Sequence, residues 1–314
     1  MTRSAFDQPH IVLCGPLRSG TTLLRLMIGQ HSQVVGRNES DLLFDALSPE
    51  GIEATDGEAY KAAARADMAF ELMGFREPTG TSAREVFEDL VVQHEAGDRR
   101  LLLTLHRHFE RAAELLPNAF FIRLRRDPRD VALSSVAMGW GGKPYFGVQP
   151  WVDAETSWRS AEAKLPRDRW VEIFYDDLVN DPRATMGKIL SAAGLPFEEE
   201  TLSPPSDSTY DAPRPRAPDA WKRKLSEREA AEINYRLAPL EEGCGFALEP
   251  KSRPSAVRLV QIWLAAKIER MRFEADRYGF GSTVKMHFAK RFGSEELRAK
   301  VFAERRAVHR QHLK

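Results

Sequence analysis

Short apolar runs alternate with stretches of helical periodicity along most of this chain. Apolar runs bounded by turn residues predict buried strands at 11–13, 101–105, 120–125 and 170–174, and a short strand or turn at 34–36. Apolar residues at helical spacing predict helices at 21–30, 41–47, 58–73, 83–95, 108–116, 129–138, 151–164, 181–193 and 226–241, with a loop at 139–150. This alternation favours an α/β fold with a parallel sheet covered by helices on both faces.

The last fifth of the chain has a different pattern. Apolar residues interleaved with Lys and Arg predict a basic amphipathic helix over 255–277, and 295–309 is a candidate for another. Residues 251–314 contain 16 Lys/Arg and 6 Asp/Glu, although the whole chain is neutral. We therefore predict a domain at 1–250 and a basic helical extension at 251–314.

Three kinds of partner for this extension are considered. The helices could pack on protein, either the first domain or a second subunit in a homo-oligomer, and this is how amphipathic helices are usually buried. They could also contact an anionic membrane surface. Nucleic acid is not expected, because the sequence contains no nucleic-acid-binding motif.

Composition sets few further limits. The chain is 42% hydrophobic and 29% charged, which is ordinary for a globular protein. Its two cysteines, Cys14 and Cys244, are too few for a disulfide framework and favour a reducing compartment. No apolar run approaches the roughly 20 residues of a transmembrane helix, and none resembles a signal peptide. We therefore expect a cytoplasmic protein.

The segment between the first strand and the first helix has the spacing of a phosphate-binding loop. Four residues separate Gly15 from Gly20, and the backbone N–H groups at the following helix start would face an anion. The hydroxyl donors beside them are Ser19, Thr21 and Thr22. Thr21 stands where the usual lysine would grip the β- and γ-phosphates of ATP, and Arg18 is the loop's cation. The loop predicts an anion site for a ligand other than ATP; a tight turn without a ligand is the alternative.

A second basic segment follows the strand at 120–125. Arg126 comes directly after this strand, at the edge where open α/β sheets bind ligands. Ser134 follows eight residues later on the predicted helix, where it could help to hold a second phosphate. A surface cluster of salt bridges is the alternative for this segment.

Together these segments resemble the sulfotransferases that use 3′-phosphoadenosine-5′-phosphosulfate (PAPS), above all their bacterial and tyrosylprotein-type branch. In that family, the loop matched by 15–24 binds the 5′-phosphosulfate, and the Arg and Ser matched by Arg126 and Ser134 bind the 3′-phosphate. Residues 174–178 resemble the family's Tyr-Glu-Asp-Leu segment, which implies that Tyr175 lies near the nucleotide. A weaker match to the basic loop that closes over the nucleotide adds Arg214, Arg216, Trp221 and Lys222.

The resemblance, which spans about 10–240, implies a three-layer P-loop-type fold and PAPS as cofactor, with no metal required. It implies transfer of the sulfuryl group to a hydroxyl of an alcohol or phenol, in line with the departing phosphate. The family's general base, a glutamate 21 residues after the loop arginine, corresponds to Glu39. Arg18 would stabilise the developing charge. The acceptor itself is not indicated by the sequence.

One family feature is missing. The region at 101–108 lacks the lysine that stabilises the bridging oxygen in many members. His106, Arg107, His108 or Arg100 could replace it, and His106 is also an alternative base. This missing lysine keeps a non-catalytic function open, that of a nucleotide-binding protein with a membrane- or nucleic-acid-binding basic tail. A second rival, although the loop lacks its lysine, is a P-loop phosphotransferase of the same fold.

Overall fold

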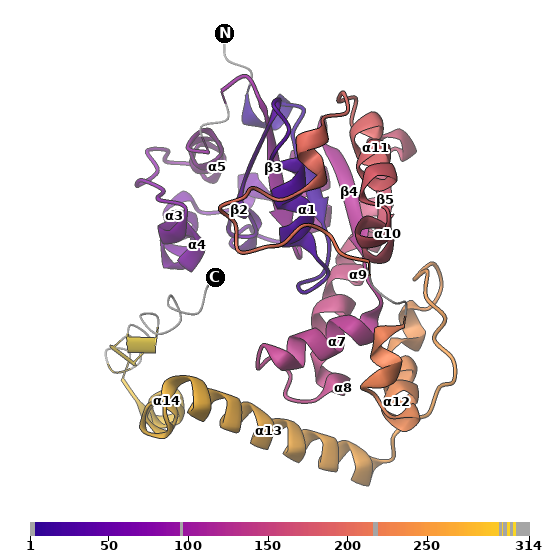
Figure 1. Ribbon diagram of the computed structural model, residues 1–314. Coiled ribbons are helices and arrows are strands. Elements are labelled where there is room, and N and C mark those ends of the chain that lie inside the picture. Colours follow the sequence, from indigo (N-terminus) through magenta and orange to yellow (C-terminus); the bar gives the residue numbers. More distant parts are fainter. Residues whose placement is uncertain are drawn as a thin grey trace. The chain divides into compact units, whose positions relative to one another are not determined.

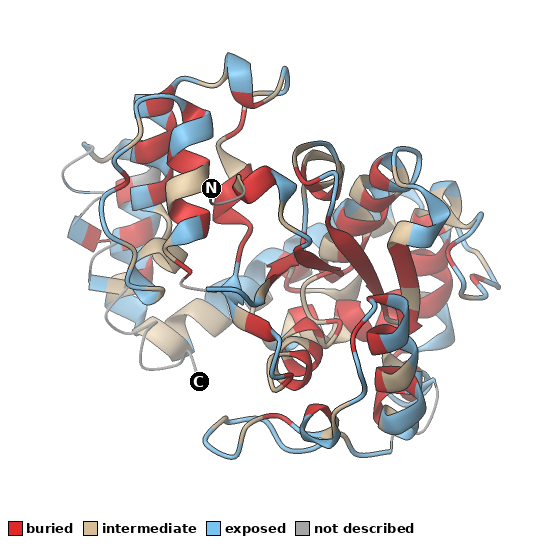
Figure 2. Ribbon diagram, turned by 90° about the horizontal axis from the view of Figure 1, so that it is seen from above, coloured by how far each residue is buried: buried red, intermediate tan, exposed pale blue. Residues whose placement is uncertain are grey.

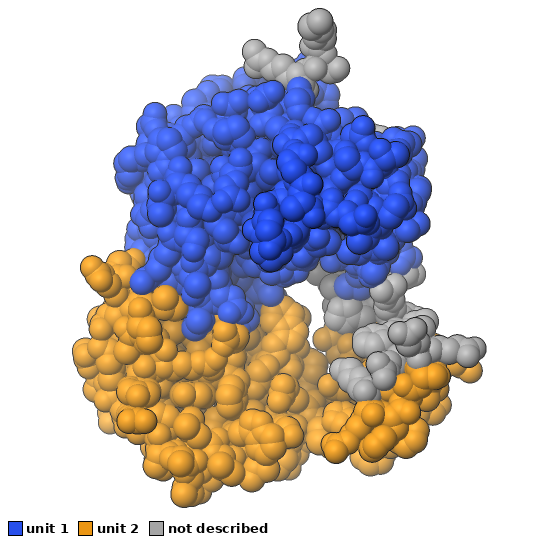
Figure 3. Space-filling model, turned by 180° about the vertical axis from the view of Figure 1, so that it is seen from behind, with its two compact units in different colours: residues 1–127, 150–220 blue, residues 128–149, 221–314 orange. Residues whose placement is uncertain are grey.

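The computed structural model describes residues 4–94, 97–215 and 219–294, together with Leu297, Lys300, Val301, Glu304 and Arg305. The chain folds into two compact units, shown in Figure 3. The first unit comprises residues 1–127 and 150–220, and the second comprises 128–149 and 221–314. The predicted boundary at residue 250 stays a prediction.

A five-stranded parallel sheet forms the centre of the first unit (Figure 1). Its strands lie in the order β2-β3-β1-β4-β5. They are β1 (Ile11–Cys14), β2 (Val34–Glu39), β3 (Arg100–Leu105), β4 (Phe120–Arg125) and β5 (Trp170–Phe174). In the register of the central strand, Ile11 pairs with Leu102 of β3 and with Phe120 of β4. All five strands therefore end at the same edge of the sheet.

Helices cover both faces of this sheet, whose three central strands are buried except at Arg100, the first residue of β3 (Figure 2). Val12 and Phe121 belong to one apolar cluster, which includes Phe87 and Trp158; Leu13 and Ile122 belong to the other. The helices of this unit are α1 (Thr21–Ile28), α2 (Leu42–Asp45), α3 (Gly57–Ala66), α4 (Met68–Leu72), α5 (Ala83–Val92), α6 (Phe109–Leu115), α9 (Gln149–Glu162), α10 (Tyr175–Asn180) and α11 (Pro182–Ala192). The predicted three-layer α/β fold is confirmed.

The second unit is helical. It contains α7 (Pro128–Ala137), α8 (Pro144–Gly147), α12 (Glu227–Leu237), α13 (Ala256–Tyr278) and α14 (Phe280–Phe292). A side chain at Gly142 would place its Cβ 2.1 Å from the carbonyl oxygen of Ala266, so this glycine lets the 139–142 turn lie directly against α13. The predicted helical C-terminal extension is confirmed, although most of 295–309 lies outside the described residues. Among the helices described, none is both long and apolar enough to cross a membrane.

Several predicted elements differ in the structure. The helix expected at 58–73 is broken at Asp67, whose carboxylate accepts a hydrogen bond from the backbone of Ala69 and caps a new helix. The loop expected at 139–150 contains α8, because Pro144 occupies the first helical position, where proline is favourable. The short strand or turn at 34–36 is a six-residue strand that extends to Glu39.

Candidate active site

The loop between β1 and α1 is a tight backbone turn pressed against the end of β4. A Cβ at Gly15 would lie 2.9 Å from the carbonyl oxygen of Leu124, so only glycine fits there without a shift. Gly20, the N-cap residue just before α1, has a φ of +97°, in the left-handed region that glycine favours. The Ser19 hydroxyl donates to the Pro16 carbonyl at 2.6 Å and is fully buried. The hydroxyl hydrogen of Ser19 therefore stabilises the turn. The prediction was that it would point toward an anion.

Arg126 and Tyr175 lie against this loop. One guanidinium nitrogen of Arg126 donates to the Arg18 carbonyl at 2.8 Å. The guanidinium carbon of Arg126 lies 4.4 Å from the centre of the Tyr175 ring, a cation–π contact. The same ring packs on Gly20, where an added Cβ would lie 2.4 Å from a ring carbon. The structure thus brings together three of the segments that were predicted to bind the nucleotide, all of them in the first unit.

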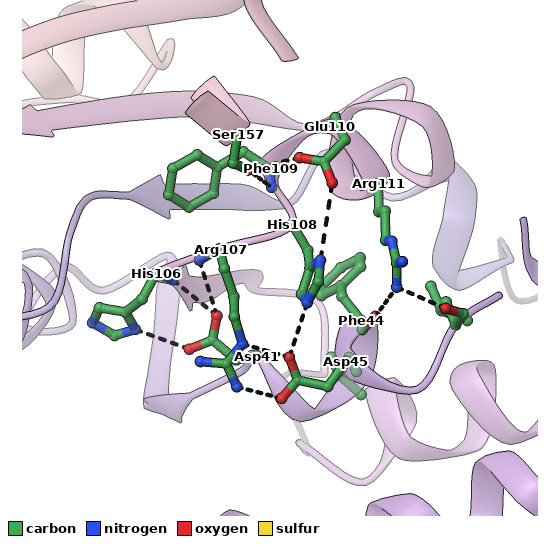
Figure 4. Close-up of polar contacts among 12 residues, drawn as sticks. Asp41, Phe44, Asp45, His106, Arg107, His108, Phe109, Glu110, Arg111 and Ser157 are labelled. Carbon is green, nitrogen blue, oxygen red and sulfur yellow. Dashed lines mark hydrogen bonds and ion pairs between the residues drawn. The ribbon is translucent and has the colours of Figure 1, made fainter. Parts of the chain in front are cut away.

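Beside the loop, the ends of β2 and β3 bring together a cluster of Glu39, Asp41 and His106. The Nδ1 atom of His106 lies 2.9 Å from a carboxylate oxygen of Asp41, and its backbone N–H donates to the other oxygen at 2.9 Å (Figure 4). Its Nε2 atom lies 3.1 Å from the Thr21 hydroxyl and 3.8 Å from a Glu39 carboxylate oxygen. The predicted base and its alternative are therefore neighbours, and both are next to the loop.

Burial and charge act in opposite directions on His106. Burial lowers the pKa of the imidazole, but the hydrogen bond and charge of Asp41 raise it, and so does the charge of Glu39. The net effect is a pKa above the ordinary value for histidine. The Glu39 side chain is 51% exposed, so a substrate hydroxyl could approach it from solvent. The cluster can therefore combine an accessible carboxylate with an imidazole that tends to carry a proton.

The same three side chains offer ligand atoms that lie within 4.8 Å of one another, which is close enough for a metal ion. Two of these groups, Asp41 and His106, already bond each other directly. Their arrangement is that of an acid–base pair, in which a carboxylate fixes the orientation of an imidazole.

The model of the sulfotransferase family matches residues 9–199 of the chain. The chain belongs to this family. Protein-tyrosine sulfotransferase 2 from Gallus gallus is 23% identical over 211 residues, which cover 64% of this chain and 55% of that protein. Protein-tyrosine sulfotransferase 1 from Danio rerio is 25% identical over 210 residues, which cover 62% and 56%. The chain therefore spans about half the length of these curated relatives.

Solved structures of sulfotransferases are also similar to the chain. The sulfotransferase domain from the curacin biosynthetic pathway is 24% identical, covers 62% of this chain and 77% of its own, and has a TM-score of 0.46. A mouse sulfotransferase complexed with PAP is 13% identical, covers 76% and 88%, and has a TM-score of 0.44.

Of the four residues considered as replacements for the family's lysine, only His106 is shown in contact with the loop. Arg107 is ion-paired with Asp45, as Figure 4 shows. His108 lies 3.1 Å from the same carboxylate. Arg100 begins β3, at the opposite edge of the sheet, where it donates to the Ala193 carbonyl at 2.6 Å. The prediction that Arg100 could act at the site is therefore wrong, because the site lies at the carboxyl ends of the strands.

The other predicted nucleotide contacts are divided between the two units. Ser134 on α7, Trp221 and Lys222 belong to the second unit, where the Trp221 ring centre lies 4.0 Å from the guanidinium carbon of Arg129. In the first unit, the exposed Arg214 lies 3.2 Å from the carboxylate of Asp211. Arg216 lies outside the described residues. Thr22, in the first turn of α1, is half-buried.

Sequence reasoning missed Asp41. Asp41 is 7% exposed, and it accepts hydrogen bonds from the backbone N–H groups of His106 and Arg107 as well as contacting the imidazole. Its position two residues after Glu39, the predicted base, was the available signal. A second acid at the ligand edge of the sheet suggests a partner for a cationic or proton-carrying side chain.

Proposed function

We propose that this chain is an enzyme that transfers the sulfuryl group of PAPS to a hydroxyl of an alcohol or phenol. The observation that carries the proposal is the contact between the acid–base cluster and the loop, through His106 and Thr21 at 3.1 Å. A proton-accepting group beside an anion-binding loop is what a group transfer to a hydroxyl needs. Membership of the sulfotransferase family identifies the group as sulfuryl.

The residues around the loop fit an anionic nucleotide. Gly15 and Gly20 leave the backbone bare of Cβ atoms, so its N–H groups can approach an anion closely at the start of α1. Arg18 and Thr22 would contact the phosphosulfate, together with the backbone of Thr21. Arg126, on the face of Tyr175, would neutralise a further phosphate. By resemblance alone, Ser134, Arg214, Arg216, Trp221 and Lys222 would complete the nucleotide site.

In the proposed reaction, Glu39 accepts the hydroxyl proton of the acceptor. A bond forms between the acceptor oxygen and sulfur as the bond from sulfur to the phosphate oxygen breaks, and adenosine 3′,5′-bisphosphate leaves. Glu39 suits this role because its carboxylate is half-exposed and 3.8 Å from the imidazole of His106. The acceptor can therefore reach it from solvent.

We assign His106 the part that a lysine has in many family members. Its raised pKa favours the imidazolium, and its Nε2 atom faces Thr21 of the loop, where charge would develop on the leaving oxygen. Asp41 holds the ring from the opposite side through Nδ1. If His106 were instead the base, it would have to be neutral before the reaction, and the two roles predict different pH dependence.

Radiolabelled transfer tests the proposal. The chain is incubated with PAPS labelled in its sulfuryl group and a panel of phenols, alcohols, sugars, lipids and tyrosine peptides. We expect label on at least one acceptor, and a loss of about 100- to 10,000-fold for Glu39→Gln. Glu77→Gln is the matched control, because the Glu77 side chain is 54% exposed, close to the value for Glu39. Full activity of Glu39→Gln would show that the base is another group.

The pH profile separates the two roles of His106. With Glu39 as base and imidazolium as charge stabiliser, the rate falls as the pH rises through the pKa of His106. With His106 as base, the rate rises over the same range.

The two alternative functions would give different results in these assays. A phosphotransferase would use ATP with Mg²⁺ in place of PAPS, and a non-catalytic protein would bind the nucleotide without turnover.

A further inference from the structure

The helix α13 exposes an apolar stripe. Val257, Val260, Leu264, Ile268 and Met271 recur at helical spacing and are 48% to 69% exposed. The buried residues of this helix, Ile262 and Ala266, lie on its opposite side. α13 therefore packs through the face that carries Ile262 and Ala266 and leaves most of its large aliphatic side chains in solvent.

The next helix, α14, also exposes an apolar stripe, and most of its residues are aromatic. Phe280, Val284, Phe288 and Phe292 follow one another at intervals of four residues on α14 and are 51% to 75% exposed. Altogether, 11 of the 18 large apolar side chains that are exposed among the described residues lie between 257 and 292. Such a concentration marks an interaction surface, which we call the arm surface.

The arm surface is basic. Residues 257–292 contain eight Lys/Arg and three Asp/Glu, and the three acids all lie on α13, so α14 carries only Lys and Arg charges. Lys267 and Arg272 flank the aliphatic stripe on α13 by helical position, and the Lys267 ammonium lies 3.7 Å from the ring centre of Trp263. Long cationic side chains beside aromatic and aliphatic groups can keep their charges in water while the apolar groups enter an apolar phase.

We propose that the arm surface binds the surface of an anionic lipid bilayer, with α13 and α14 lying in the interface. Charge complementarity selects this occupant. The apolar side chains would enter the boundary between headgroups and acyl chains, and the Lys and Arg side chains would meet the anionic headgroups. A second copy of the chain fits less well, because pairing α14 with itself would bring together two helices that carry only positive charge. This proposal is independent of the sulfuryl transfer.

Vesicle flotation with the full chain tests the proposal. The vesicles contain phosphatidylcholine alone, or phosphatidylcholine with about 30% phosphatidylglycerol, an anionic lipid. We expect binding to the anionic vesicles to be at least about 100-fold tighter, since each Lys or Arg near such a surface adds to the attraction. High salt is expected to weaken this binding.

Two variants and one control identify the surface. Leu264→Glu and Phe288→Glu each place a negative charge on the arm surface at an exposed position, and each is expected to reduce anionic-vesicle binding at least about tenfold. Val92→Glu is the matched control, because Val92 is 69% exposed on α5 of the first unit. It should bind like the unaltered chain.

Three results would overturn the proposal. The first is equal binding to neutral and anionic vesicles, or to neither. The second is an equal loss of vesicle binding in the two variants and in the Val92→Glu control. The third is a dimer in solution that fails to bind vesicles and becomes monomeric with Leu264→Glu, which would make the arm surface an interface between copies. Light scattering on the same samples measures the oligomeric state.

Discussion

Replacing Gly20 with alanine should damage the loop in two separable ways. The first is the backbone, because an alanine at a φ of +97° costs about 1–2 kcal/mol. The second is the new methyl group, whose carbon would lie 2.4 Å from a ring carbon of Tyr175. Pushing this ring away from the loop costs a further 1–3 kcal/mol or so. The expected total is about 2–5 kcal/mol.

Gly74→Ala is the matched control, since Gly74 has a φ of +68° and no atom within 4 Å of an added Cβ. This variant should lose only the stability that depends on the backbone conformation, about 1–2 kcal/mol. Thermal unfolding measures the difference, at about 2–4 °C for each kcal/mol in a unit of this size. Gly20→Ala should also bind adenosine 3′,5′-bisphosphate at least about tenfold more weakly. Equal melting temperatures and equal affinities for the two variants would refute the packing of Tyr175 on the loop.

Three further predictions concern the pair of Asp41 and His106, the binding of the nucleotide by Arg126, and the burial of the two cysteines. Asp41→Asn should lower the melting temperature more at pH 6 than at pH 8. The raised pKa of His106 means that its pairing with Asp41 stabilises the fold fully below about pH 6.5, and that this stabilisation is lost as the pH rises through the pKa of His106 in the folded protein. Equal losses of melting temperature at the two pH values would contradict this. Arg126→Ala should weaken bisphosphate binding about 10- to 150-fold by calorimetry, and an unchanged affinity would exclude the contact. Neither Cys14 nor Cys244, both buried, should react with a thiol reagent before unfolding, and burial also raises the pKa of Cys14; rapid labelling of the native protein would contradict this.

The sheet, the loop and its flanking helix could be predicted from the sequence because their signals are local. An apolar run followed by two glycines and a helical pattern specifies β1, the loop and α1 without knowledge of distant residues. The contact between Asp41 and His106 was not predictable in this way. It depends on the pairing of β2 with β3, whose register shifts between Gly36 and Glu39. No sequence pattern marked that shift.

The burial of α13 shows a similar limit. The apolar residues and helical spacing of this segment predicted α13 nearly to its ends, but they did not indicate which face is buried. The structure buries Ala266 and leaves the larger side chains of Leu264 and Ile268 exposed. The reason lies in Gly142, which permits backbone contact with α13 only where the facing residue is small. Such a close approach joins residues more than 100 positions apart and leaves no periodic signal.

The central claim is that the loop, Arg126 and Tyr175 bind the nucleotide of a sulfuryl donor. Titration calorimetry with adenosine 3′,5′-bisphosphate in the absence of metal tests it most directly, with ATP and Mg²⁺ as the comparison. The account predicts saturable binding of the bisphosphate, and at least about tenfold weaker binding of ATP with Mg²⁺, because the loop has Thr21 where ATP-binding loops have lysine. Tight binding of ATP with Mg²⁺ and none of the bisphosphate would contradict it.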